Sequence, residues 1–90
     1  MKLYHTSQSV ERGYDTYSDM VVCAKSEEAA RNIHPAHAWV RNDEEERQAC
    51  WNGSYGSGWA HRPDQVTVVY LGEADESVEE GIICVSFHAG

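Results

Sequence analysis

The stretch DMVVCAKSEEAARNIHP, residues 19–35, decides the fold. Residues 19–24 form a β-branched run with the length and composition of a strand. Ser26 is a typical helix N-cap, and the two glutamates after it stand where the helix dipole favours acids. Pro35 then ends the helix. We therefore predict a strand followed directly by one short helix, whose apolar face consists of Ala29, Ala30 and Ile33.

Three further strands are predicted on either side of this stretch. Lys2–Ser7 is a short candidate for an edge strand, and residues 66–71 and 82–87 are richer in β-branched residues. The last two strands are separated by an acidic segment, so we predict that they form an antiparallel hairpin with a long acidic tip. The mixed polarity of 82–87 predicts a sheet that the helix covers on one face and an aromatic loop partly covers on the other.

The middle of the chain, residues 36–65, lacks a regular pattern. Glycines and aromatic residues alternate over 50–59, which favours a long loop, and Asp43 can cap a short helix near 43–48. The order of elements is ββαββ. We predict one α+β domain over residues 1–90, with an antiparallel sheet of about four strands, one short helix on one face and a long aromatic, glycine-rich loop. Neither a signal peptide nor an apolar run of membrane-spanning length is expected.

Charge is the most informative property for function. Fifteen acidic side chains stand against seven basic ones, a formal net charge of −8. This balance disfavours nucleic acids and anionic membranes as partners and favours basic protein surfaces. The acids form two clusters, Asp43, Glu44, Glu45 and Glu46, and Glu73, Asp75, Glu76, Glu79 and Glu80.

No residue pattern identifies a reaction. A zinc site could be built from His34, His37, Cys50 and His61, but the spacing of these residues matches no known zinc motif. The favoured interpretation is that His34 lies at the helix end and the other histidines lie on the surface. Cys50 could also form a nucleophile pair with His61, but its interpretation as a small apolar residue is favoured. Cys23 and Cys84 lie in apolar runs, which predicts buried thiols in a reducing compartment. We therefore predict a binding protein without metal or cofactor, not an enzyme.

The aromatic residues leave two interpretations open. They can form an exposed patch beside the carboxylates, which is the composition of an interface with anchor residues. They can also form a second small core that fixes the long loop to the sheet. The residues concerned are Tyr14, Tyr17, Trp39, Trp51, Tyr55 and Trp59.

Several segments resemble a group of small proteins encoded by tailed bacteriophages and prophages. The resemblance rests on the stretches 1–4, 13–19, 21–24, 26–31, 71–74 and 81–90 and covers most of the chain. It implies a phage origin and expression in the cytoplasm of a bacterial host. Small acidic phage proteins include anti-CRISPR inhibitors, which gives an analogy by class and charge.

We predict an inhibitor that occupies the basic surface of a host protein or ribonucleoprotein complex and thereby acts as a DNA mimic. It would bind neither nucleic acid nor membrane directly. The alternative is a phage accessory or structural protein that self-associates, with a homodimer formed through its sheet edge. A zinc-stapled domain is less favoured. The predicted partner-binding residues are the two acidic clusters with Trp51, Tyr55 and Trp59.

Overall fold

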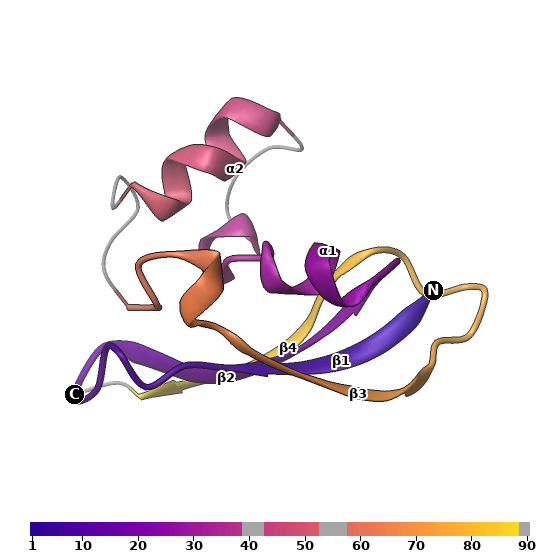
Figure 1. Ribbon diagram of the computed structural model, residues 1–90, viewed down its shortest axis with the longest axis horizontal. Coiled ribbons are helices and arrows are strands. Elements are labelled where there is room, and N and C mark those ends of the chain that lie inside the picture. The colour runs from indigo at the N-terminus through magenta and orange to yellow at the C-terminus, as the bar shows by residue number, and fades with distance from the viewer. Residues whose placement is uncertain (39–42, 53–57, 89–90) are drawn as a thin grey trace.

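The computed structural model describes residues 1–38, 43–52 and 58–88 and has the predicted α+β fold. A four-stranded antiparallel sheet carries its helices on one side (Figure 1). The strands are β1 (Lys2–Ser7), β2 (Thr16–Ala24), β3 (Thr67–Glu73) and β4 (Gly81–His88). The helices are α1 (Glu27–Arg31) and α2 (Glu44–Trp51), with two 3-10 turns, η1 (Pro35–Ala38) and η2 (Pro63–Gln65).

The strand order β3-β1-β2-β4 corrects two expectations. β1 and β2 pair at the centre, so β1 is not an edge strand. β3 and β4 lie at opposite edges and do not form a hairpin. Strands are spaced about 4.8 Å apart, so a connection of seven residues easily crosses the two central strands. Contacts anchor this crossing loop, since the Ala74 amide donates to the Met1 carbonyl (3.0 Å) and the Cys23 thiol lies 3.9 Å from the Val78 carbonyl.

Both helices begin at the predicted caps. The Ser26 hydroxyl accepts a hydrogen bond from the Ala29 amide at 3.1 Å. The Asp43 carboxylate accepts one from the Glu45 amide at 2.8 Å, and α2 begins at the next residue. The short helix expected near 43–48 is therefore present, and it extends to Trp51.

The core lies between the sheet and the layer that contains α1. Ala30 is fully buried there and Ala29 packs against the core, as the helical spacing predicts. Ile33 also packs against the core, but α1 ends at Arg31 and Pro35 begins η1, so the helix is shorter than predicted. Trp59 packs on the same side, so the expectation that the aromatic loop covers the opposite face is wrong for this residue. The core consists of Tyr4, Met20, Val22, Ala24, Ala30, Trp59, Ala60 and Val66.

The opposite face of the sheet is open. The register places His5 between Val21 on β2 and Val69 on β3, and Val69 is 50% exposed. No described helix lies on this side of the sheet (Figure 1). Of the two cysteines in apolar runs, Cys23 is buried as predicted, because the crossing loop covers it. Cys84 is exposed, because β4 is an outer strand.

Candidate functional site

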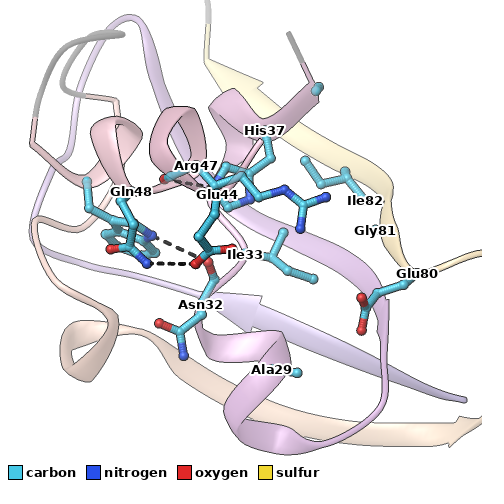
Figure 2. A pocket seen from close by; sticks show the side chains of 12 residues that line it. Ala29, Asn32, Ile33, His37, Glu44, Arg47, Gln48, Glu80, Gly81 and Ile82 are labelled. Atoms are coloured by element: carbon cyan, nitrogen blue, oxygen red, sulfur yellow. Dashed lines mark hydrogen bonds between the residues drawn. The ribbon is translucent and has the colours of Figure 1, made fainter. Parts of the chain in front are cut away.

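A pocket of about 470 Å³ opens between α1, η1, α2 and the start of β4 (Figure 2). Its volume lies within the range of sites that hold a small molecule or a large side chain. The pocket has an apolar part, formed by Ala29, Ile33, Trp51 and Ile82, and a polar rim. The polar side chains are Asn32, His37, Glu44, Arg47, Gln48 and Glu80.

Trp51 and His37 hold α2 in the position that forms this pocket. The Trp51 indole N–H points to the Asn32 carbonyl at 3.4 Å, and its ring meets the His34 ring edge-on at 4.9 Å between centroids. On η1, His37 Nε2 lies 3.2 Å from the Arg47 carbonyl of α2. These polar and ring contacts add to the burial of Cys50 and to the packing of Trp51 against the core.

The two histidines are held in their neutral form. His34 Nδ1 accepts the Ala36 amide at 3.0 Å, and His37 Nδ1 accepts the His34 amide at 3.2 Å. A nitrogen that accepts a hydrogen bond carries no proton, so Nε2–H of His37 is the donor to α2. Burial, with a smaller contribution from His37, lowers the pKa of His34 to about 4. Burial also lowers the pKa of His37.

Charges of both signs meet at the pocket. Figure 2 shows the Arg47 side chain extending from α2 toward Gly81 and Ile82, with Glu80 on the far side. Glu44 lines the pocket from α2, and its carboxylate also accepts a hydrogen bond from Gln48 at 3.3 Å. Within the described ranges Arg47 forms no ion pair through its guanidinium. Two carboxylates against one guanidinium leave the polar rim with a net negative charge.

The first acidic cluster lies at the beginning of α2. Asp43 caps the helix, and Glu44, Glu45 and Glu46 occupy its first turn, where the helix dipole stabilises negative charge. Asp43, Glu44 and Glu45 are exposed, and Glu46 is half-buried. The helix therefore presents several carboxylates to the surroundings of the pocket.

The second acidic cluster lies on and beside the loop that crosses the end of the sheet. Asp75 accepts hydrogen bonds from the Ser77 amide and hydroxyl, and these bonds lower the pKa of its carboxyl. Glu73 accepts the Tyr70 hydroxyl. Gly81 follows the loop with φ +141°, a conformation that side chains disfavour, and Glu80 lies directly before it at the pocket. All five acids are exposed, namely Glu73, Asp75, Glu76, Glu79 and Glu80.

The two clusters are thus joined at one pocket through Glu44 and Glu80, which the sequence did not predict. Thirty-six positions separate these residues along the chain, and only the crossing loop of the true topology brings them to one cavity. Arg47 and Ile82 were also missed. The one available signal was Arg47 itself, a cation directly after four acids and three positions from Glu44.

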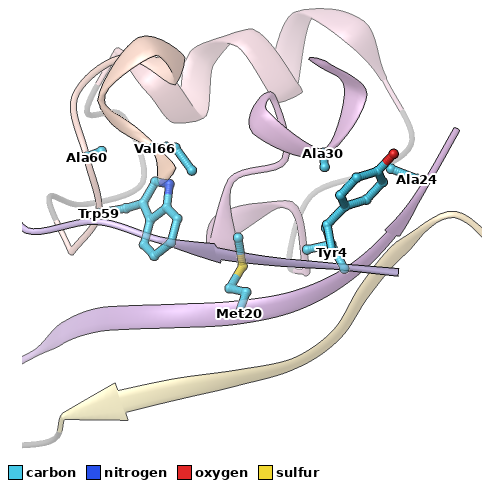
Figure 3. Packing of buried hydrophobic residues seen from close by; sticks show 8 residues of the cluster. Tyr4, Met20, Ala24, Ala30, Trp59, Ala60 and Val66 are labelled. Atoms are coloured by element: carbon cyan, nitrogen blue, oxygen red, sulfur yellow. The ribbon is translucent and has the colours of Figure 1, made fainter. Parts of the chain in front are cut away.

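The aromatic residues of the predicted patch or second core lie in different environments. Trp59 is 1% exposed and lies among the core residues above the sheet (Figure 3), so it serves as core and cannot act as an exposed anchor. Trp51 is half-buried and lines the pocket. Tyr55 and Trp39 lie outside the described residues. Trp59 is thus buried, but in the main core of the domain and not in a separate small core, and Trp51 packs against that core beside the candidate site.

The four candidate zinc ligands do not form one site, although His34 and His37 are neighbours. His61 Nε2 lies 2.7 Å from a Glu11 carboxylate oxygen, and Cys50 is buried with its thiol donating to the Glu46 carbonyl at 3.3 Å. Burial raises the pKa of the Cys50 thiol, which opposes a thiolate nucleophile. Across residues 1–38, 43–52 and 58–88, no group of three or more His, Cys, Asp or Glu side chains is arranged to hold a metal ion.

Comparison with protein-family models, curated proteins and solved structures gives no match to this chain. In the described parts of the chain, no helix has both the length and the apolar character that a membrane crossing requires.

Proposed function

We propose that this protein binds a basic surface of another protein and excludes nucleic acid from that surface. The observation that supports the proposal is the meeting of Glu44 and Glu80, from two separate acidic clusters, at one partly apolar pocket. Lysine and arginine side chains combine an apolar stem with a cationic head. Such a side chain fits the pocket with its stem near Ile33 and Ile82 and its head between the carboxylates.

Charge and apolar contact affect different steps of this binding, namely association and dissociation. The exposed carboxylates attract and orient a basic partner, which increases the association rate and makes it sensitive to salt. Contacts in a partly apolar pocket, including the half-buried Trp51, slow dissociation. Both contributions are needed, because isolated exposed ion pairs contribute only about 0–1 kcal/mol each.

Arg47 opposes a cationic guest, because its guanidinium extends across the same pocket (Figure 2). It must turn aside when a partner side chain enters. Arg47 therefore reduces affinity, and it also selects against weakly matched cations. Removing the Arg47 guanidinium should therefore strengthen binding of the basic partner.

We further propose a target class from charge and from the resemblance to phage proteins. The partner is a basic nucleic-acid-handling protein or ribonucleoprotein complex in the cytoplasm of a bacterial host, with defence complexes of the CRISPR type as the leading candidates. Phosphate mimicry explains why carboxylates would be gathered on one small protein. The protein acts in this proposal by occupying a surface, without catalysing a reaction.

The test is affinity capture from bacterial host lysate with mass spectrometry at low and high salt. We expect one basic nucleic-acid-handling complex, retained at about 0.05 M salt and lost at about 0.5 M, where charges are screened within a few ångströms. Glu44→Gln with Glu80→Gln should weaken binding roughly tenfold, about 1.4 kcal/mol. Arg47→Gln should strengthen it.

The matched control removes two exposed charges that do not line the pocket, by Asp15→Asn with Asp64→Asn. This control changes the net charge equally and should leave binding nearly intact. Capture that is insensitive to salt, or equal losses in both double variants, would contradict the proposal.

A further inference from the structure

The chain's own Arg47 places a guanidinium in the pocket between α2 and β4. Arg47 is half-buried and lines the cavity, and its side chain reaches toward Gly81 and Ile82 (Figure 2). The contact of this residue with His37 is made by its backbone carbonyl, so the side chain does not take part in it. The pocket therefore already accommodates a guanidinium, which indicates the kind of cationic head that fits there.

The two carboxylates of the pocket lie apart from each other. Glu44 comes from α2 and Glu80 from the end of the crossing loop, and Figure 2 shows the Ile33 side chain between them. A lysine ammonium is a compact charge, so in contact with one carboxylate it leaves the other at a distance. A guanidinium carries five N–H donors that point outward in one plane, and it can face carboxylates on two sides. The separation of the carboxylates therefore favours arginine over lysine.

The apolar part of the pocket favours the same residue type. A cation that enters it loses part of its surrounding water, because half of the lining is apolar side chain and includes Trp51. A guanidinium is more weakly hydrated than an ammonium, so its transfer into such a site costs less free energy. It also packs favourably on an aromatic ring, such as that of Trp51.

We propose that the pocket selects an arginine side chain of the basic partner, which takes the place of the Arg47 guanidinium. This inference rests on the proposed function and names the residue type that the site binds. The incoming side chain enters a space that already fits its head group. Arg47 turns outward in this exchange, while its backbone carbonyl keeps the contact with His37.

The test uses two blocked, glycine-flanked peptides of equal charge, one with a central arginine and one with a central lysine. Each is titrated into the isotope-labelled full chain and followed by the amide shifts of Ile33, Gly81 and Ile82, which line the pocket. The arginine peptide should bind roughly threefold to tenfold more tightly than the lysine peptide. A citrulline peptide, which has the shape of arginine without its charge, should bind more weakly than either.

Three variants separate shape from charge. Arg47→Lys keeps the net charge but removes the resident guanidinium, so the arginine peptide should bind this variant several-fold more tightly than the wild type. Glu44→Gln with Glu80→Gln should weaken binding of the arginine peptide. The matched control, Asp15→Asn with Asp64→Asn, changes two exposed acids outside the pocket and should leave the affinity unchanged.

The outcomes distinguish this inference from the proposed function. Equal affinity of the arginine and lysine peptides at the pocket, or unchanged affinity in Arg47→Lys, would overturn arginine selection and leave the proposed function standing. Shifts that avoid the pocket residues, or a citrulline peptide that binds as tightly as the arginine peptide, would overturn both.

Discussion

The two helices of this protein are attached in different ways. α1 packs directly on the sheet, with Ala30 fully buried and contacts to β1, β2 and β3. α2 packs against η1, and its contacts with the rest of the protein include the Trp51–Asn32 hydrogen bond, the His34–Trp51 ring contact and the His37–Arg47 hydrogen bond. The scaffold therefore depends on apolar burial. The helix that carries half of the acidic site combines the burial of Cys50 and the packing of Trp51 against the core with these polar and ring contacts. The site can accordingly be disturbed without loss of the fold.

The largest effect is expected in the scaffold, from Trp59→Ala. Among the residues that the structure describes, Trp59 is the largest fully buried side chain, and its loss leaves a cavity between the sheet and the layer above it. The free energy of unfolding should fall by about 3–5 kcal/mol, measured by chemical denaturation. Because a domain of this size has only about 5–15 kcal/mol of stability, the variant should be close to unfolding. A loss below about 1 kcal/mol would contradict the assignment of Trp59 to the core.

A smaller effect is expected from Trp51→Ala. This change removes one hydrogen bond and one ring contact of a half-buried side chain, so the unfolding free energy should fall by roughly 1–3 kcal/mol. Amide exchange should accelerate in α2 and remain slow in β1 and β2. Partner binding should fall with it, because α2 forms one side of the pocket. Uniform acceleration across the sheet would mean that the two regions are not separable.

A pH change should distinguish the two regions without mutation. The pKa of His34 is lowered from 6.5 to about 4, so the unfolded state binds more protons between these values. The stabilisation is complete above about pH 6.5 and is lost as the pH falls toward 4. Protonation also removes the acceptor nitrogen that His34 offers to Ala36. Amide exchange in α2 should therefore accelerate over this window before exchange in the sheet does.

The sheet should lose stability only at a lower pH than α2 does. His5 and Ser18 form hydrogen bonds with Asp19 and lower the pKa of its carboxyl below 3.8. The stability that Asp19 contributes is present above pH 3.8 and is lost only as the pH falls through its lowered value. Simultaneous opening of α2 and of the sheet near pH 5, followed by nuclear magnetic resonance, would contradict the separation of the two regions.

The sequence predicts the scaffold better than the site, and the reason is physical. Ser26, Ala30 and the β-branched runs encode local structure, and those elements appear within a few residues of their predicted ends. Strand order depends on which pairs bury the most surface, and local pattern does not contain this information. The hairpin of 66–71 with 82–87 and the edge position of β1 were wrong for that reason.

The site depends on the strand order, so it could be predicted only in part. The acidic clusters were evident from composition, and Asp43 correctly marked the start of α2. The meeting of Glu44 with Glu80 follows from the crossing loop and could not be read from either segment. The burial of Trp59 and the exposure of Cys84 were likewise decided by the packing of the helices on one face and by the outer position of β4.

The most direct test of the proposed function is displacement of nucleic acid from the captured partner. Fluorescence anisotropy of a labelled oligonucleotide bound to the purified partner should fall as wild-type protein is added. The Glu44→Gln/Glu80→Gln variant should require roughly tenfold more protein, and Asp15→Asn/Asp64→Asn should match the wild type. If the partner binds this protein and its nucleic acid together, with unchanged affinity for each, occupation of a nucleic-acid surface is contradicted.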